Sequence, residues 1–344
     1  LKLKKGCHVD IVPMFPATPE NLAWHPDAAS NLNFISFEEA ANHLYDVAIL
    51  TWWKTTLEAY RVNAGHYIYF VQSIESWFYP KEEGPLRKLV DATYTHNLPV
   101  ITEANWIKDH LYTNYTVTSW LVLNGVRKDI YKPYGDKFEK KSDGHFRVLL
   151  EGPVNVDFKN VPKTVALCRR SKADEVWLLT SSDVSAFEGV DRVFSRVPIH
   201  ETAKIYRSCD VIVKLSYVEG MFGPPLEMFH CGGTAIVYNV TGHDEYIQHQ
   251  INGLVVRKDD DEKVVDYLNM LKSNNQKLQE LKYEALKTAF DWPDWNTCSA
   301  HFYTAVKEIV QQMQPPDKVN LFAGIQNSFQ QYVQEEEVRK KTLV

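Results

Sequence analysis

Short apolar runs alternate with amphipathic and polar segments along most of the chain. Runs such as "DVAIL" (46–50) are continuously apolar, which is typical of strands that helices cover on both faces. The predicted strands of the first half are 8–15, 46–53, 66–72, 98–104 and 116–123. Those of the second half are 146–152, 174–181, 191–197, 210–216, 234–240 and 253–258. Helical patterns such as "IHETAKIYRSC" separate them, so we expect an α/β protein with doubly wound parallel sheets.

The polar, turn-rich stretch 131–146 interrupts this rhythm and is the predicted linker. It separates an N-terminal domain (1–130) from a C-terminal domain (147–314). The amphipathic tail 315–344 is predicted either to dock onto a domain or to make an oligomer contact. The opening "LKLKKGCHVDIV" is typical of a last helical turn, a glycine cap and a second strand. We therefore interpret the first strand as missing through truncation, with a naturally shortened domain as the alternative.

Composition and charge narrow the class of protein. A chain of 344 residues with 44% hydrophobic residues is expected to form two globular domains. The net charge of −6 argues against a nucleic-acid partner. The cysteines are odd in number and widely spaced, as in a reducing compartment. No apolar run is long enough to span a membrane, and Lys2, Lys4 and Lys5 are either solvated or in contact with anionic lipid. We expect a cytoplasmic protein with at most peripheral contact to the inner face of a membrane.

The bend "SYVEGMFGPPLEMFHCGG" (216–233) carries the candidate chemistry. Glu219 follows the carboxyl end of a predicted strand, which is where open α/β sheets bind ligands. Pro224 suits the start of a helix, and Glu227 is expected in that helix's first turn. A helix N-terminus attracts phosphate, and carboxylates accept hydrogen bonds from sugar hydroxyls. The bend therefore suits a sugar nucleotide. The alternative is that Glu227 only complements the helix dipole and Glu219 is solvated.

These residues resemble a known family. "EGMFGPPLEMFHCGGTAIV" looks like the E-x7-E signature of retaining GT-B glycosyltransferases of the GT4 type. "IHETAKIYRSCDVIVKLS", "TGHDEYI" and "NGV" are similar to other segments of that family, and the resemblance covers most of residues 40–310. It implies two Rossmann-like domains facing a cleft. "DVAILTWWKTTLEA" and "YFVQSIESWFYP" resemble segments of bacterial rhamnosyltransferases that build surface polysaccharides.

The resemblance also implies roles for individual residues. Glu219 would contact the donor sugar and Lys159 would stabilise the leaving diphosphate, which makes these two the catalytic residues. Glu227 would hold the ribose. The remaining implied donor-binding residues are Gly152, Gly220, Met221, Phe222, Gly223, Gly242 and Glu245. The family expects an arginine where Pro153 stands, so the diphosphate lacks one cation; the candidates to replace it are Arg169, Arg170 and Lys214.

The remaining question for the sequence is which residues could bind a metal or an acceptor. The acidic run "DDDEK" (259–263) opens a predicted helix, and no histidine or cysteine spacing suits a metal, so we expect no cofactor and no metal. Gln72, Glu75 and Trp77 follow a predicted strand and are candidates to contact a glycan or lipid-linked saccharide acceptor. The aromatic residues of this segment are equally compatible with a core position.

The favoured hypothesis is a metal-independent, retaining glycosyltransferase that uses a nucleotide-sugar donor. The first alternative is a GT-B scaffold that binds carbohydrate or nucleotide with little or no catalysis, which Pro153 favours. A dinucleotide-dependent oxidoreductase is disfavoured because no G-x-G-x-x-G follows a strand. A sugar-nucleotide epimerase remains a further alternative.

Overall fold

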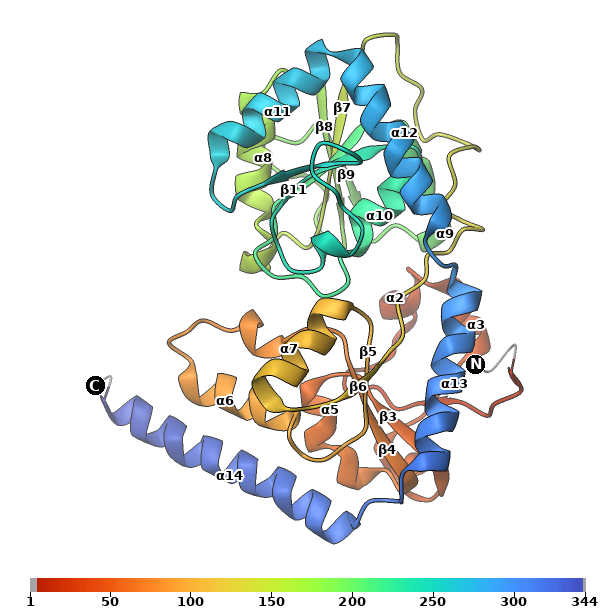
Figure 1. The fold of residues 1–344 in the computed structure, drawn as a ribbon, viewed down its shortest axis with the longest axis vertical. Coiled ribbons are helices and arrows are strands. Elements are labelled where there is room, and N and C mark those ends of the chain that lie inside the picture. The colour runs from red at the N-terminus through yellow and green to blue at the C-terminus, as the bar shows by residue number, and fades with distance from the viewer. Residues whose placement is uncertain (1–4, 343–344) are drawn as a thin grey trace. The chain divides into compact units, whose positions relative to one another are not determined.

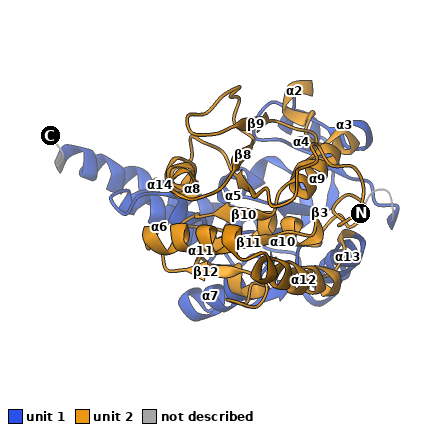
Figure 2. Cartoon of the chain, turned by 90° about the horizontal axis from the view of Figure 1, so that it is seen from above, with its two compact units in different colours: residues 1–18, 30–124, 296–344 blue, residues 19–29, 125–295 orange. Residues whose placement is uncertain are grey.

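The computed structural model describes residues 5–342 and divides the chain into two compact units. Unit 1 comprises residues 1–18, 30–124 and 296–344, and unit 2 comprises residues 19–29 and 125–295 (Figure 2). The predicted helical turn at the start, with Lys2 and Lys4, lies outside the described residues. Gly6, the predicted cap, has a φ of 66°.

Unit 1 contains a parallel sheet whose strands lie side by side in chain order, β3-β4-β5-β6. Its strands are β3 (Tyr45–Leu50), β4 (Ala64–Val71), β5 (Val100–Thr102) and β6 (Ser119–Leu121). Its helices are α4 (Phe37–Ala41), α5 (Trp53–Leu57), η1 (Ala59–Arg61), η2 (Glu75–Phe78), α6 (Gly84–Thr93), α7 (Asn105–Tyr115), α13 (Trp295–Gln312) and α14 (Lys318–Thr342). These strands confirm the predicted runs from 46–53 to 116–123.

The predicted strand 8–15 is much shorter in the structure. Only β1 (Asp10–Ile11) is extended, and it pairs with β2 (Asn33–Phe34) rather than with the main sheet of unit 1. Proline residues at 13 and 16 lack the N–H that a longer ladder needs. The next segment, α2 (Pro19–Leu22) and most of α3 (Pro26–Asn31), belongs to unit 2, where the Ile199 N–H donates to the Trp24 carbonyl at 2.8 Å.

Helices cover both faces of the unit 1 sheet, and one of them, α13, comes from a segment that was predicted to belong to the C-terminal domain. One face packs against α5, α6 and α7, with Leu321 and Ile325 of α14 joining the same core. On the other face, Ile68 and Ile101 pack against Ala305 and Ile309 of α13. The segment 296–314 was predicted in the C-terminal domain 147–314, but its apolar side chains complete the core of unit 1. The tail helix α14 likewise docks within unit 1, on α5 and α6.

Unit 2 is a six-stranded parallel sheet in the order β12-β11-β10-β7-β8-β9. Its strands are β7 (Arg147–Glu151), β8 (Glu175–Thr180), β9 (Arg192–Ser195), β10 (Val211–Lys214), β11 (Thr234–Tyr238) and β12 (Leu254–Val256). Its helices are η3 (Asp157–Lys159), α8 (Val161–Arg170), α9 (Ile199–Ser208), α10 (Gly223–His230), η4 (His243–Glu245), α11 (Asp261–Ser273) and α12 (Asn275–Asp291). All predicted strands of the second half are confirmed.

Alternate residues of the unit 2 strands enter two separate cores. Helices α8 and α11 cover one face of the sheet, and α9 and α10 cover the other (Figure 1). Leu149 and Ile212 enter the core with α9, α10 and α12, whereas Val148 and Val213 enter the core with α8 and α11. This two-residue alternation with apolar side chains on both faces explains the continuous apolar runs. The chain order reverses between β7 and β10, which are neighbours although three helices and two strands separate them. Such a reversal is the usual ligand-binding position of an open α/β sheet.

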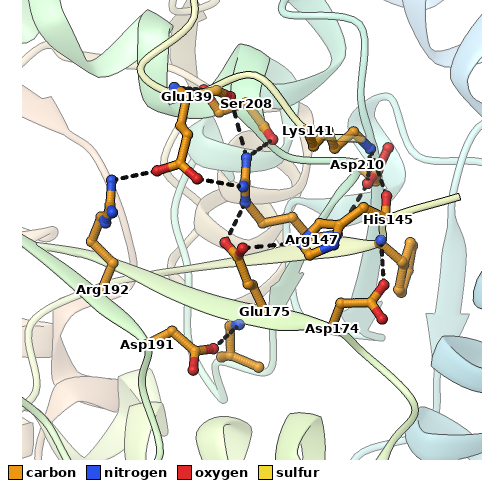
Figure 3. Close-up of polar contacts among 12 residues, drawn as sticks. Glu139, Lys141, His145, Arg147, Asp174, Glu175, Asp191, Arg192, Ser208 and Asp210 are labelled. Carbon is orange, nitrogen blue, oxygen red and sulfur yellow. Dashed lines mark hydrogen bonds and ion pairs between the residues drawn. The ribbon is translucent and has the colours of Figure 1, made fainter. Parts of the chain in front are cut away.

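The predicted linker 131–146 is held within unit 2 rather than free. Arg147, 1% exposed, donates to the Glu175 carboxylate at 2.6 Å and to the Ser208 carbonyl at 3.0 Å, and it also contacts the carbonyl and carboxylate of Glu139 (Figure 3). The Arg207 guanidinium donates to the Asp136 carbonyl at 2.8 Å. The polar composition of 131–146 is typical of a flexible linker, but these contacts with Arg147 and Arg207 hold the segment against unit 2. In residues 5–342 no helix combines the length and the apolarity that crossing a bilayer requires.

Candidate active site

The loops that follow β7 and β10 bring together the predicted catalytic residues. Glu219 lies five residues beyond β10, and Lys159 ends the short turn η3 that follows β7. The Lys159 ammonium contacts Glu219 Oε2 at 2.8 Å. A second ammonium, that of Lys214 at the end of β10, lies 3.5 Å from Glu219 Oε1 and 2.7 Å from Glu151 Oε2. The point where the strand order reverses therefore carries two lysines and two carboxylates.

These charges set the protonation state of the cluster. Burial alone would raise the pKa of Glu219, but the ammonium groups of Lys214 and Lys159 outweigh it and hold that pKa below its usual value. Burial would lower the pKa of Lys214, and Glu151 and Glu219 reverse the effect, so its pKa is raised. With a lowered pKa for its carboxyl and a raised pKa for its ammonium, the Glu219–Lys214 pair is charged at neutral pH. The alternative of a solvated Glu219 is wrong, because this residue is 7% exposed.

Gly152 shapes the turn after β7. Its φ of 143° lies in a region that other residues adopt only with strain. A Cβ there would lie 3.7 Å from Lys159 Cβ and 3.7 Å from the Lys214 ammonium. Gly152 therefore lets the backbone bend directly beside both lysines. Pro153 next to it supplies neither a cation nor an N–H.

Glu227 lies in the second turn of α10, not in the first turn as predicted, because the helix begins at Gly223. Pro224 and Pro225 occupy the first turn and lack N–H groups, which leaves those of Gly223 and Leu226. The Tyr246 hydroxyl donates to the Phe222 carbonyl and bonds the Leu226 backbone. Tyr246 therefore caps α10, a role that the sequence analysis missed although the residue lies in the quoted segment "TGHDEYI".

Two tyrosines surround the Glu227 carboxylate. The Tyr206 hydroxyl donates to Glu227 Oε2 at 2.9 Å, and Tyr131 also bonds this carboxylate. Burial raises the pKa of Glu227 to about 7, although the tyrosine hydrogen bonds act in the opposite direction. A carboxyl group with this pKa is divided between its acid and its anion at neutral pH. It can accept a hydrogen bond from a ligand hydroxyl or donate one.

The other predicted donor-binding residues differ in whether their side chains are buried or accessible. The Phe222 side chain is fully buried in the core, so only its backbone is available, and Met221 packs against the same core. Gly242 adopts a φ of 81° before η4, the turn that ends at Glu245. This segment is tied to the bend, because the Thr241 hydroxyl donates to the Glu219 carbonyl at 3.1 Å. Gly220 and Gly223 flank Met221 and Phe222 in the bend itself.

The acceptor-side candidates lie in unit 1 and have different surroundings. Glu75 is 5% exposed, and its Oε2 accepts from the Trp53 N–H at 2.8 Å and from the Tyr69 hydroxyl at 3.1 Å. It therefore caps α5 from within the core, and burial raises its pKa to about 7. Gln72 is partly exposed and donates to the Thr51 carbonyl, and Trp77 stacks on Trp106 with ring centroids 5.8 Å apart. Gln72 and Trp77 remain candidates, whereas Glu75 is occupied within the core.

The acidic run 259–263 opens a helix, α11, as the sequence analysis predicted. Asp260 caps α11, and Asp259 and Asp261 each lie 2.8 Å from the Lys163 ammonium. Across the part of the chain that the structure describes, no three histidine, cysteine, aspartate or glutamate side chains gather so that they could hold a metal ion.

Comparison with known proteins places this arrangement in a class. Residues 191–288, which include the bend and both of its glutamates, match the family model described as "Glycosyl transferases group 1". The two units together have the GT-B fold, as their similarity to solved glycosyltransferase structures shows. The matched segment lies within unit 2 and includes Glu219, whereas Lys159, its partner at the strand-order reversal, precedes the matched range.

The similar structures share little sequence with this chain. Sucrose-phosphate synthase from Thermosynechococcus elongatus has a TM-score of 0.66 at 16% identity, over 78% of this chain and 75% of its own. HepE from Anabaena, in complex with UDP-glucose, has a TM-score of 0.65 at 12% identity, over 87% and 98%. A glycosyltransferase from Rickettsia africae has a TM-score of 0.61 at 15% identity, over 90% and 92%. No curated protein matches the sequence.

Proposed function

We propose that this protein is a retaining, metal-independent glycosyltransferase that moves a sugar from a nucleotide-sugar donor to a saccharide acceptor. The observation that carries the proposal is the contact of Lys159 with Glu219 at 2.8 Å, at the strand-order reversal of unit 2. A cation next to a sugar-binding carboxylate is what cleavage of a sugar–phosphate bond needs. The group 1 family match over residues 191–288 supports the same activity.

In this proposal the diphosphate binds beside Lys159 and the turn at Gly152. Negative charge develops on the leaving phosphate as the glycosidic bond breaks, and a positioned ammonium stabilises it. The N–H of Gly223, at the start of α10, is a second donor of the right polarity. Both groups belong to the chain itself, so the leaving-group charge is met without a metal ion.

The two glutamates of the bend take different parts. Glu219, held ionised by two lysines, accepts hydrogen bonds from the donor sugar's hydroxyl groups. Glu227 accepts from the ribose hydroxyls, and Tyr206 keeps its carboxylate oriented. Gly220, Met221 and Gly242 would contribute backbone contacts to the bound donor, and Glu245 of η4 would be a further donor-binding residue.

The ligands of similar structures and the resemblance of individual segments indicate which donor and which acceptor to test first. Solved structures of HepE contain UDP or UDP-glucose, which makes a UDP-sugar the first donor to test. The resemblance of "DVAILTWWKTTLEA" to bacterial rhamnosyltransferases favours transfer of rhamnose in surface polysaccharide assembly. On the acceptor side, Gln72 and Trp77 would bind a glycan or a lipid-linked saccharide, since aromatic faces suit sugar rings.

One observation favours a second candidate, a GT-B scaffold that binds donor but transfers little. Pro153 stands where the family has an arginine. The cluster of Glu151, Lys159, Lys214 and Glu219 also pairs each ammonium with a carboxylate. Without ligand, the site therefore has little net positive charge with which to attract a diphosphate.

A thermal-shift screen against UDP-, GDP-, dTDP-, ADP- and CMP-linked sugars tests the proposal. A donor present at about 100 times its dissociation constant should add roughly 2.7 kcal/mol of stability. We expect one nucleotide series to shift the melting temperature of the parent, and Lys159→Met to lose most of that shift. If none of the five series shifts the parent, the nucleotide-sugar proposal is wrong. Turnover of the selected donor then separates the enzyme from the inactive scaffold.

A further inference from the structure

The two lysines of the candidate site differ in how they are held. Lys159 lies on η3, a single turn, and its side chain is 22% exposed. The contacts that the structure gives its ammonium are Glu219 Oε2 and the ring of Phe158, whose centroid is 5.4 Å away. Rotation of this one exposed side chain can bring its ammonium to an incoming anion.

Lys214 is instead fixed in the sheet. It is the last residue of β10, and its side chain is 2% exposed. The pairing of Val213 with Leu150 places it next to Glu151 at the end of β7. Its ammonium contacts the Glu151 carbonyl at 3.1 Å, Glu151 Oε2 at 2.7 Å and Glu219 Oε1 at 3.5 Å. Three oxygens from two loops therefore hold one buried cation in place.

This difference matters when a ligand takes Lys159 away from Glu219. The Glu219 carboxylate is buried, and a buried charge without a partner strongly destabilises the folded protein. Lys214 remains beside Glu219 Oε1 and covers that loss. The two arginines that the sequence analysis considered are paired elsewhere and do not neutralise Glu219: Arg169 pairs with Asp191, and Arg170 pairs with Glu262.

We infer that Lys214 is the positioning residue of this site: it keeps Glu219 in place and ionised against the donor sugar while Lys159 moves to the diphosphate. The inference rests on the proposed function. It assigns the two cations separate tasks, so that Lys214 compensates for the absent arginine by holding Glu219 rather than by contacting phosphate itself. The Glu151–Lys214 pair at the ends of β7 and β10 then acts in catalysis by fixing the position of Glu219.

Crystal structures of two variants without ligand test the positioning directly. In Lys159→Met, Glu219 should keep its place against Lys214, because the 3.5 Å contact is independent of Lys159. In Lys214→Met, the Glu219 side chain should turn toward Lys159 alone or toward solvent. If Lys214→Met does not fold, Glu151→Gln/Lys214→Met replaces it, since this pair removes both charges together. The inference is overturned if Glu219 leaves Lys214 in the first variant or keeps its position in the second.

Kinetics then separate positioning from stability, with the donor chosen by the thermal-shift screen and with its nucleoside diphosphate as the binding probe. Lys214→Met should lower kcat roughly tenfold to 100-fold, the range that charged hydrogen bonds carry, while diphosphate affinity stays within about threefold. Lys214→Arg should recover much of the rate. In a Glu219→Gln background, Lys214→Met should cost less than about threefold, because its target is already neutral.

An equal loss in both backgrounds, or a fall in diphosphate affinity as large as the fall in kcat, would show that Lys214 acts on the phosphate or on the fold. A parent protein that binds no donor in the screen, with the crystallographic result as expected, would instead remove the proposed function and leave the Lys214–Glu219 coupling intact. The two failures are therefore distinguishable.

Discussion

At the scale of single residues, three buried or partly buried glutamates show how neighbours decide what a carboxylate does. Glu219 lies between two ammonium groups and has a lowered pKa. Glu227 faces two tyrosine hydroxyls, and Glu75 faces one tyrosine hydroxyl and one backbone N–H; burial raises the pKa of each to about 7. Only Glu219 is held ionised by neighbouring cations, which suits the role toward a donor sugar that we propose for it.

Glu227→Ala should weaken donor binding without abolishing turnover of bound donor. Its hydrogen bonds to ribose are present in both the ground state and the transition state, so their loss of about 1.5–3 kcal/mol is expected mainly in the dissociation constant. Calorimetry with the donor measures this. Tyr206→Phe, which removes the hydroxyl bonded to Glu227 but keeps the carboxylate, is the matched control and should weaken binding less. Unchanged affinity in Glu227→Ala would exclude a ribose contact.

Glu75→Gln should change the pH dependence of stability rather than acceptor binding. The pKa of Glu75 is raised in the folded state, so its ionisation costs stability as pH rises from its usual value near 4.5 to about 7. A glutamine cannot ionise, and relative to the parent this variant should gain about 2 kcal/mol between pH 5 and pH 8. Urea unfolding at both pH values measures the difference. Glu75→Ala, which removes the cap on α5, should be destabilised at both pH values. A stability difference between Glu75→Gln and the parent that is the same at pH 5 and pH 8 would contradict the raised pKa of Glu75.

The sequence predicted Glu219, Glu227, Lys159 and Gly152 because they match a family motif at known spacing. It named Lys214 only as one of three candidates to replace the absent arginine, and it could not predict that Lys214 lies beside Glu219 or that Tyr246 caps α10. Both contacts depend on which strands and turns lie side by side, and this information is absent from local residue spacing. Glu75 was predicted to face a ligand for the same reason: a position after a strand does not reveal whether the side chain turns outward or into the core.

At the scale of elements, charged residues fasten the segment 131–146 to the sheet of unit 2. Arg147 is the centre of this network (Figure 3). Its guanidinium also lies 4.0 Å from the centroid of the Trp177 ring. The Arg147 hydrogen bond is the main cause of the lowered pKa of Glu175. Two strands, a helix end and the preceding loop therefore share one buried cation.

Arg147→Met should destabilise the protein by about 3–5 kcal/mol, because it leaves the Glu175 carboxylate without its buried partner. Adding Glu175→Gln should recover part of that loss, since the charge is then removed. The control is Arg192→Met: Arg192 is 41% exposed and pairs with Glu139 at the surface, so its loss should cost less than about 1 kcal/mol. Urea unfolding compares the four proteins. Equal effects of the two arginine substitutions would show that burial of Arg147 contributes nothing.

Most strands were predictable because helices cover both sheet faces and each strand reads as an apolar run. The exception, 8–15, became the two-residue β1 because it has β2 as its sheet neighbour and prolines nearby. The assignment of α13 failed for a different reason. Its apolar stripe shows that one face is buried, but not that Ile68 and Ile101 of unit 1 are what it covers.

At the scale of the whole molecule, the two units differ in what their sheets offer a ligand. The described sheet of unit 1 runs in chain order, whereas the order in unit 2 reverses between β7 and β10. The carboxyl ends of these two strands and the segments that follow them carry the lysines, the glycine turn and the glutamates of the bend. The proposed donor-binding residues are therefore those of unit 2.

Donor binding should survive removal of divalent ions, because ammonium groups and backbone N–H groups meet the diphosphate charge in the proposed site. Calorimetric titration of the selected donor with and without EDTA should give affinities that agree within about twofold. An affinity that falls more than about tenfold in EDTA, and returns on addition of Mg²⁺ or Mn²⁺, would make a metal ion part of the site.

The central claim is that Glu219 acts on the transferring sugar at a site that also binds the nucleotide. Turnover of the selected donor by the parent and by Glu219→Gln, followed by NMR so that the anomeric configuration of the product is seen, tests it most directly. The account predicts a product that retains the donor's configuration, a Glu219→Gln rate lower by about tenfold or more, and almost unchanged affinity for the free nucleotide. Inversion of configuration, or equal rates for the two proteins, would contradict it.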